Sequence, residues 1–302
     1  MAKGVFTTKL NPGYDDRPEE RYHFQSRYLS AVEQTIGDTI VYYEPRRRSD
    51  EASSRGGRSS YFATARPYAI IEDAKNQGFY YCLVEDYLDF EKAVPFRTGH
   101  HFHESILQRG DGETNRGAFG NSVRIVPDAE FESILSAGFN KSSIDFAVQP
   151  DSPVVPLPEW DALPISFERP MVELTITKPF RDVAFRRVVR AAYDNRCAVT
   201  GLRLINGGGR PEVQAAHIQA VEHKGPDSVR NGLALSGTIH WMFDRGLLSV
   251  DDDMTILKAK SGLPVEVEGL INASGRLNLP KDPGQWPHPA YLTHHREHRF
   301  KG

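Results

Sequence analysis

Four polar residues in the C-terminal part of the chain have types and spacings that suit metal-dependent hydrolysis. Asn231 follows His217 by 14 residues, and His240 follows Asn231 by nine. Asp244 is four residues beyond His240, a spacing that places both side chains on one face of a helix. An imidazole and a carboxylate presented together in this way can bind a divalent cation. The pattern therefore predicts a pair of metal ligands near a further histidine.

His217 is the candidate general base of this group. An imidazole exchanges protons readily near neutral pH, so it can take a proton from an attacking water. A metal ion would stabilise the charge that develops on a scissile phosphate and on the leaving oxygen. Asn231 precedes a glycine in a loop, where its side chain can fix the backbone and so hold His217 in place. Each residue taken singly could serve packing, but their joint spacing favours hydrolysis.

Local patterns predict the elements that would position these side chains. Residues 182–193 have an apolar face and an arginine face, as an amphipathic helix does. A short strand is expected at 212–218 and a helix at about 236–245, with a loop between them. The candidate base would then close the strand, and the ligand pair would lie on the second helix.

The stretch that contains these residues resembles the HNH (ββα-metal) endonuclease family. The chain reads AAHIQAV around residue 217 and VRNGLALSGTIHWMFDRGLL from residue 229. This matches the branch of the family whose core reads A-H-I, N-G-L-x-L and H-x-x-F-D-x-G-L, and the likeness covers residues 183–250. It implies that His217 is the general base and that Asn231 steadies the loop. It also implies that His240 and Asp244 bind a divalent ion, Mg²⁺ first, with Mn²⁺, Ni²⁺ or Zn²⁺ as alternatives.

Two positions depart from the family pattern. Many HNH nucleases have Asp or His just before the base histidine as a metal ligand, whereas this chain has Ala216. Either water completes the coordination, another residue replaces the ligand, or the module is degenerate and does not cleave. The candidates for a replacement are Glu212, Gln214 and Asp227. Related proteins often have a C-x-x-C zinc knuckle where this chain has Cys197 and Thr200, so Cys197 is expected to be a buried thiol.

The histidines of HHREH, residues 294–298, offer a second possible metal cluster. His294 and His298 are four residues apart, which suits one helix face. We favour the simpler interpretation, in which residues 290–300 form a C-terminal helix whose histidines are mostly solvated.

The composition is that of an ordinary globular protein. Of 302 residues, 39% are hydrophobic and 25% are charged, and no apolar run approaches the length of a membrane span. The N-terminus has no apolar segment typical of a signal peptide. Two cysteines argue against a disulfide framework and exclude a four-cysteine zinc site. A reducing environment, and hence a cytoplasmic location, is expected.

Positive charge is concentrated in two segments, although the net charge of the chain is −3. Residues 181–210 contain seven arginines and two aspartates, and a second arginine-rich segment lies within residues 46–66. Such patches suit contacts with DNA phosphates, and a merely solvated surface is the other interpretation. The candidates for phosphate binding are Arg46, Arg47, Arg48, Arg186, Arg187 and Arg190.

A proline-rich segment predicts the domain boundary. Residues 149–170 contain six prolines, a composition typical of an extended linker. We therefore expect a recognition domain at 1–148, the linker at 149–170 and a nuclease domain at 171–302.

The first half of the chain is rich in short aromatic and β-branched segments. Strands are expected at 38–43, 60–65, 68–71 and 79–84, and helices at 26–34 and 128–136. The segment GDTIVYYEPRR resembles a strand of PUA-like domains, the superfamily that includes the SRA, YTH and EVE readers of modified bases. The predicted fold class is therefore α+β, with a PUA-like curved sheet or open barrel and flanking helices, followed by a ββα-metal domain.

Aromatic side chains in this half could form a pocket for a base. Aromatic faces stack on an extruded base, and a few polar groups read its edge. The candidates for a modified-base pocket are Tyr22, His23, Phe24, Tyr43 and Asp86. The other interpretation is that most of these aromatic side chains form the core of a small barrel.

Together these features predict a modification-dependent DNA endonuclease. Its first domain would flip and read a modified base in double-stranded DNA, and its HNH domain would cut nearby. One HNH site cuts one strand, so a double-strand break would need two copies, and a homodimer is expected. Two alternatives stay open: an HNH nuclease that reads unmodified DNA or nicks it, and a non-catalytic nucleic-acid-binding adaptor.

Overall fold

The computed structural model describes residues 2–9, 15–47, 53, 55–139, 177–206, 209, 211–260 and 263–302. The chain divides into two compact units, Met1–Ala184 and Phe185–Gly302, and the division falls within helix α5 (Lys178–Ala192). The predicted linker at 149–170 lies outside the described residues, as does Arg48. The predicted domain limits therefore stay a prediction.

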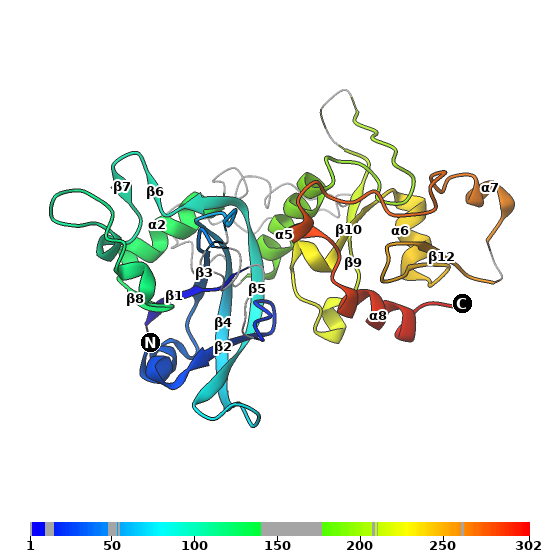
Figure 1. Ribbon diagram of the computed structural model, residues 1–302. Helices are drawn as coiled ribbons and strands as arrows, with labels where there is room; N and C mark the ends of the chain where they lie inside the picture. The colour runs from blue at the N-terminus through cyan, green and yellow to red at the C-terminus, as the bar shows by residue number, and fades with distance from the viewer. Residues whose placement is uncertain are drawn as a thin grey trace, which may run out of the picture. The chain divides into compact units, whose positions relative to one another are not determined.

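A six-stranded sheet in the order β2-β5-β4-β3-β1-β8 dominates the first unit (Figure 1). Its strands are β1 (Lys3–Thr7), β2 (Arg21–Gln25), β3 (Ile40–Glu44), β4 (Ser60–Glu72), β5 (Phe79–Pro95) and β8 (Val123–Val126). Strands β1 and β3 are parallel, and the other neighbouring strands are antiparallel. Three register shifts between β4 and β5 bend this long hairpin and help the sheet to curl.

Shorter elements surround this sheet. The helices are α1 (Leu29–Thr35) and α2 (Asp128–Gly138), with 3-10 turns η1 (Ser26–Tyr28), η2 (Ser105–Leu107) and η3 (Ala118–Gly120) and a small hairpin of β6 (Arg97–Thr98) and β7 (His101–Phe102). The predicted α+β class, a curved sheet with flanking helices, is confirmed for this unit.

Both faces of the sheet are covered by side chains. Val5 and Val41 lie in one core, together with Phe131 of α2. Their chain neighbours Phe6 and Tyr42 lie in a second core on the opposite face. Because successive residues of a strand point to opposite faces, a strand covered on both sides is mostly apolar, and all five residues of β3 are buried. Its one charged residue, Glu44, forms an ion pair with Arg58.

One detail of the predicted strands is wrong. Residues 60–65 and 68–71 were expected as two strands separated at Pro67, but both belong to β4. Pro67 lies at a register shift between β4 and β5, where its missing N–H does not interrupt regular pairing. The strand predicted at 79–84 likewise continues to Pro95 as β5.

A buried ion pair fixes one end of the first unit. Arg124 of β8 donates to both carboxylate oxygens of Glu104, from Nε at 2.7 Å and from Nη2 at 2.8 Å. The hydroxyl of Tyr61 donates to the same carboxylate at 2.6 Å. The Glu104 and Arg124 side chains are almost fully buried. A buried carboxylate is tolerated only when its oxygens are satisfied in this way.

The second unit has a two-stranded hairpin with a helix against it, followed by smaller elements. The strands are β9 (Gln214–His217), β10 (Gly232–Leu235), β11 (Leu248–Val250) and β12 (Ile256–Lys258). The helices are α6 (Gly237–Asp244), α7 (Val265–Glu268) and α8 (Pro289–His298), with 3-10 turns η4 (Val221–His223), η5 (Val229–Asn231) and η6 (Pro283–Gln285). The strand, loop and helix expected around the candidate base are confirmed as β9, the following loop with β10, and α6.

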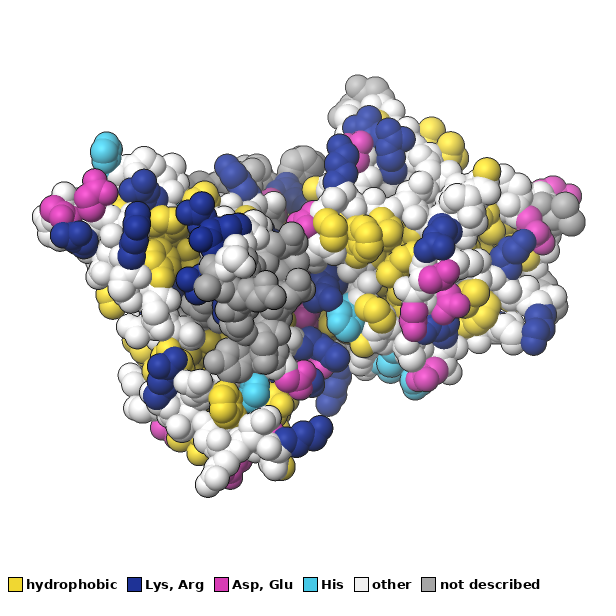
Figure 2. All heavy atoms as spheres, in the orientation of Figure 1, with side chains coloured by type: hydrophobic (Ala, Val, Ile, Leu, Met, Phe, Trp, Pro, Cys, Tyr) yellow, Lys and Arg dark blue, Asp and Glu magenta, His cyan; other side chains and the backbone are white. Residues whose placement is uncertain are grey.

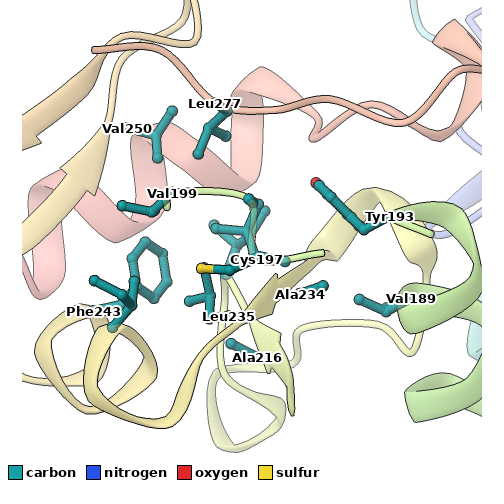
Figure 3. Close-up of a cluster of buried hydrophobic side chains, with 14 of the residues drawn as sticks. Val189, Tyr193, Cys197, Val199, Ala216, Ala234, Leu235, Phe243, Val250 and Leu277 are labelled. Carbon is teal, nitrogen blue, oxygen red and sulfur yellow. The ribbon is translucent and has the colours of Figure 1, made fainter. Parts of the chain in front are cut away.

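The core of this unit gathers around the hairpin (Figure 3). Ala216, Leu235 and Cys197 lie in one buried cluster with residues of α5, α6 and α8. Cys197 is a buried free thiol, as expected. Within the described residues no helix has the length and apolar character needed to cross a membrane.

The C-terminal helix forms as predicted, but the expectation that its histidines are mostly solvated is wrong for His295. This ring is buried and stacks on Phe243 at 3.8 Å. Its Nε2 contacts the backbone oxygen of Phe243 at 3.1 Å, and its Nδ1 contacts Ser249 Oγ at 2.9 Å. Burial lowers the pKa of His295 from 6.5 to about 4. Only a neutral ring is accommodated well here, because a charged one would be desolvated.

Breaking the buried ion pair should destabilise the first unit strongly. In Glu104→Ala, Arg124 keeps its buried charge without this carboxylate, and we expect the free energy of unfolding to fall by about 3–5 kcal/mol. Asp111→Ala is the matched control, because Asp111 pairs with Arg109 on the surface, and should cost less than about 1 kcal/mol. Urea unfolding followed by fluorescence measures both, and equal losses would contradict the prediction.

The second unit should lose stability as the pH falls from about 6.5 to about 4. Above this range His295 is neutral in both states; within it the unfolded chain binds a proton that the folded chain excludes. The difference between the two pKa values corresponds to about 3 kcal/mol. Urea unfolding at pH 7 and pH 4.5 should show a smaller pH effect in His295→Gln, whereas the exposed His298→Gln should behave as the wild type. An identical pH effect in all three proteins would refute this assignment.

Candidate active site

His217 closes strand β9 opposite Gly232, the first residue of β10. Its imidazole stacks on the ring of Phe185, with centroids 3.8 Å apart and planes 7° from parallel. A Cβ atom at Gly232 would lie 2.4 Å from a methyl group of Val189 and 3.2 Å from Phe185. The glycine is therefore required for helix α5 to approach the hairpin closely enough to place Phe185 over His217.

Asn231 ties together the loop that connects β9 to β10. Its Oδ1 accepts from the backbone N–H of Gln219 at 2.8 Å. Its Nδ2 donates to the backbone oxygens of Gln219 at 2.9 Å and Pro226 at 3.0 Å. The side chain is fully buried. These bonds agree with the loop-steadying role that the sequence predicts for Asn231.

Asp227 lies on the same loop and contacts the candidate base. Its Oδ1 is 3.0 Å from Nε2 of His217. The carboxylate is buried, whereas about a fifth of the His217 side chain is exposed, 21%. His217 is therefore held by a carboxylate at one nitrogen and by an aromatic ring against its plane.

Helix α6 presents the predicted ligand pair. His240 Nε2 is 3.5 Å from Asp244 Oδ2. On the other side of the ring, His240 Nδ1 is 2.8 Å from Gln214 Oε1 of β9. Since the amide oxygen can only accept, Nδ1 carries the proton and Nε2 keeps its lone pair on the side of Asp244.

These residues fit a divalent ion with a small number of protein ligands. Two ligand atoms at ~2.1 Å from an ion lie about 3–3.4 Å apart in octahedral or tetrahedral geometry. The separation of 3.5 Å between His240 and Asp244 is close to this range. Among the residues that the structure describes, no group of three or more His, Cys, Asp or Glu side chains is arranged to hold a metal.

The three candidates for the ligand absent at Ala216 have different partners. Ala216 itself is buried in the core of the hairpin (Figure 3). Glu212 accepts from the backbone N–H of Gly237 at 2.9 Å, at the start of α6. Asp227 contacts His217, and Gln214 contacts His240. In the described residues, no hydrogen bond or ion pair joins His217 to His240 or Asp244.

Phe185 is the site residue that the sequence did not reveal. Its position on the apolar face of an amphipathic helix predicts only a core residue. Gln214 and Asp227 were considered solely as replacement ligands, and their contacts with the two histidines were not foreseen. The one signal for Phe185 is the glycine of the N-G-L motif, which marks a close approach of another segment.

The aromatic residues predicted for a base pocket lie mainly in the sheet cores of the first unit. Tyr22 and Phe24 are buried in one core and Tyr43 in the other. His23 stacks on Tyr81 with centroids 4.5 Å apart, and its Nε2 is 3.0 Å from Asp73. These positions match the barrel-core interpretation for the three buried rings. A base-reading role for them stays a prediction.

Asp86, the fifth pocket candidate, lies outside this aromatic group. It has a left-handed backbone conformation, with φ 54°, within β5. Its carboxylate forms ion pairs with Arg66 at 2.8 Å and Arg181 at 2.9 Å. The pocket role of Asp86 also stays a prediction.

The arginines predicted to bind phosphate are at least partly exposed wherever the structure describes them. Arg46, Arg47 and Arg186 are exposed, and Arg187 and Arg190 are half-buried. Figure 2 shows Lys and Arg side chains on both units, with Asp and Glu among them. The role of these arginines in phosphate binding stays a prediction.

Comparison with known proteins finds a family match within the second unit. Residues 197–251 match the family model described as HNH endonuclease. No curated protein matches the chain. Among solved structures, the chain is similar to a "Modification dependent TagI restriction endonuclease", with 16% identity, a TM-score of 0.31, and 97% of this chain and 81% of that chain covered. A "Type IV phosphorothioation-dependent restriction endonuclease ScoMcrA" has 15% identity and a TM-score of 0.19, with 80% and 48% covered.

The family match includes all four of the residues singled out for hydrolysis, which supports nuclease activity. The chain carries an HNH endonuclease domain at residues 197–251.

Proposed function

We propose that this protein is a modification-dependent DNA endonuclease whose HNH domain hydrolyses phosphodiester bonds with His217 as general base. The observation that supports this most directly is the environment of His217. Its Nε2 contacts Asp227, its ring is stacked on Phe185, and part of the side chain is open to solvent. An imidazole that is fixed on one side and open on the other suits proton transfer from water.

In the proposed reaction, His217 takes a proton from a water molecule as the water oxygen attacks the scissile phosphorus. Phe185 and Asp227 keep the ring in place during this step. His240 and Asp244 would hold a divalent ion, Mg²⁺ first, which when bound stabilises negative charge on the phosphate and on the leaving oxygen. Asn231 keeps the loop in the conformation that brings Asp227 to His217.

Gln214 supports the metal site by fixing the tautomer of His240. Metal-bound histidines commonly donate their other N–H to an oxygen acceptor, which orients the ring. The contact between His240 Nδ1 and Gln214 Oε1 has this arrangement. We therefore assign Gln214 as the partner of His240 and not as the replacement for the ligand absent at Ala216.

The first unit is proposed as the part that selects the target. A nuclease module that contacts mainly the DNA backbone has little sequence specificity, so another domain must supply it. The curled sheet and the PUA-like strand that contains Tyr43 suit a base-flipping reader of double-stranded DNA. Exposed arginines, including Arg46 and Arg47, would bind phosphates. Two copies acting together, as a homodimer, would be needed to cut both strands.

One alternative has specific support. Tyr22, Phe24 and Tyr43 are packed in the sheet cores and leave little aromatic surface of their own for a flipped base. This favours, as the second candidate, an HNH nuclease whose first unit reads unmodified DNA or its shape.

Cleavage of modified and unmodified plasmid of the same sequence tests the proposal. With Mg²⁺ or Mn²⁺, plasmids carrying 5-methylcytosine, its hydroxymethyl or glucosyl derivatives, or N6-methyladenine form the test panel. At least one should be cut while unmodified plasmid stays intact. His217→Ala should cut about 10²–10⁴-fold more slowly and still bind DNA in a gel-shift assay.

The exposed residue His223 provides the matched control, and His223→Ala should keep full activity. Equal cutting of all plasmids would instead support the reader of unmodified DNA. If the wild type binds the plasmids but cuts none of them, the result would support a non-catalytic adaptor.

Metal binding should depend on the residues of α6. At free Mn²⁺ of about 100 times Kd, we expect the ion to raise the free energy of unfolding by about 2.7 kcal/mol, seen as a higher Tm. His240→Ala and Asp244→Ala should remove most of this rise, and Gln214→Leu should weaken Mn²⁺ affinity about 10- to 100-fold. Asp252→Ala, which removes an exposed carboxylate, is the control. If Mn²⁺ raises the Tm of His240→Ala and Asp244→Ala as much as that of the wild type, the ion binds elsewhere.

A further inference from the structure

We infer that Asp227 is a positioning residue that orients His217 and stabilises its protonated form during hydrolysis. The inference rests on the proposed role of His217 as the general base. It goes beyond that role because it assigns the proton-accepting nitrogen and the group that fixes it. The contact of 3.0 Å between Asp227 Oδ1 and His217 Nε2 is the starting observation.

Asp227 is held in place by bonds on both sides of it. Asn231 Nδ2 donates to the backbone oxygen of Pro226, the residue before Asp227, at 3.0 Å. Ser228, the residue after it, caps η5 by accepting from the backbone N–H of Arg230 at 3.2 Å. The carboxylate is thus fixed before any substrate binds. Such preorganisation lowers the cost of holding the base in its reactive orientation.

The contact determines which nitrogen of His217 is basic. An ionised carboxylate only accepts hydrogen bonds, so the proton of the neutral ring lies on Nε2. Nδ1 then keeps the lone pair, and within the described residues no group forms a hydrogen bond to it. The side chain is 21% exposed, so water can reach the ring. Nδ1 is therefore the nitrogen that takes the proton from the attacking water.

Proton transfer makes the ring cationic beside an anion. Water gives its proton to Nδ1 as its oxygen bonds to phosphorus, and the bond from phosphorus to the leaving oxygen breaks. The imidazolium then lies 3.0 Å from a buried carboxylate. Low local polarity strengthens this attraction relative to water. Asp227 therefore acts on the step in which His217 becomes charged.

Phe185 limits the other motion open to the ring. Its stacking on His217 at 3.8 Å fixes the plane of the imidazole. The hydrogen bond to Asp227 fixes the direction in which Nε2 faces within that plane. A ring restrained in both respects has one orientation toward water. The two contacts come from different segments, α5 and the loop after β9, which makes them separable by substitution.

Asp227→Asn tests the inference because the amide is similar in shape but has no charge. We expect kcat for plasmid cleavage to fall about 100-fold, while the Mn²⁺-induced rise in Tm stays as in the wild type. Glu222→Gln is the matched control: Glu222 is an exposed carboxylate on the same loop, paired with Arg299, and its loss should leave kcat unchanged.

A spectroscopic measurement tests the inference independently of activity, and its wild-type part does not depend on the folding of any variant. Ring ¹⁵N chemical shifts of His217 in the wild-type, metal-free protein should place the proton of the neutral form on Nε2. In Asp227→Asn the proton should distribute between both nitrogens.

Three results would overturn the inference: a proton on Nδ1 in the wild type, full kcat in Asp227→Asn, or loss of Mn²⁺ binding in that variant, which would make Asp227 a ligand. Failure of the proposed function looks different, because His217→Ala would then still cut DNA.

Discussion

The hydrogen bonds of one buried amide hold the loop between β9 and β10 in shape. Asn231 accepts from one backbone group and donates to two others, so the segment that joins Gln219 to Asn231, 12 positions apart, closes on a single side chain. A buried amide left unsatisfied costs about 1–3 kcal/mol, so the loop and the amide stabilise each other. The loop also bears on the proposed chemistry, since the proposed base His217 lies just before it and Asp227 lies within it. A change in this loop would move the proposed base and its partner together.

Close packing against the hairpin is the second constraint. Gly232 follows Asn231 directly, and its lack of a side chain lets Val189 and Phe185 approach β10. Two adjacent residues of one motif therefore have different roles. Asn231 fixes the conformation of the loop, and Gly232 allows helix α5 to pack closely against β10. The small side chain of Ala216 belongs to the same packing, since it lies in the core between β9 and its neighbours. A larger ligand residue there would have to displace buried groups.

The extent to which the sequence predicted this structure follows from the range of the interactions involved. The strand, loop and helix that carry His217, Asn231 and His240 were predictable because local periodicity and spacing within one short segment define them, and the ββα order followed from the family resemblance. The continuous β4 and the burial of His295 were not, since they depend on strand register and on packing between distant segments. The partners of the two histidines were missed for the same reason. The identity of a hydrogen-bond acceptor depends on loop geometry that no periodicity encodes.

The first unit shows the same limit more clearly. Its aromatic residues were compatible with two predictions from the sequence, a base pocket and a barrel core, because both use aromatic side chains. The structure places Tyr22, Phe24 and Tyr43 in the cores. Because both faces of the curled sheet are buried, most of the aromatic residues of its strands lie in the two cores. Recognition of DNA by this unit would then depend more on its exposed loops and arginines than on the rings first singled out.

The two histidines of the HNH domain have different hydrogen-bond partners, and the difference matches their proposed roles. His240 contacts a neutral amide, which can fix a tautomer without adding charge to a metal site. His217 contacts a buried carboxylate, which adds a negative charge next to a ring that becomes positive as it takes a proton. Exchanging these partners would put an uncompensated anion behind the metal ligand and leave the charged base without a counterion. The assignment of ligand and base therefore rests on their hydrogen-bond partners as well as on the spacing of the motif.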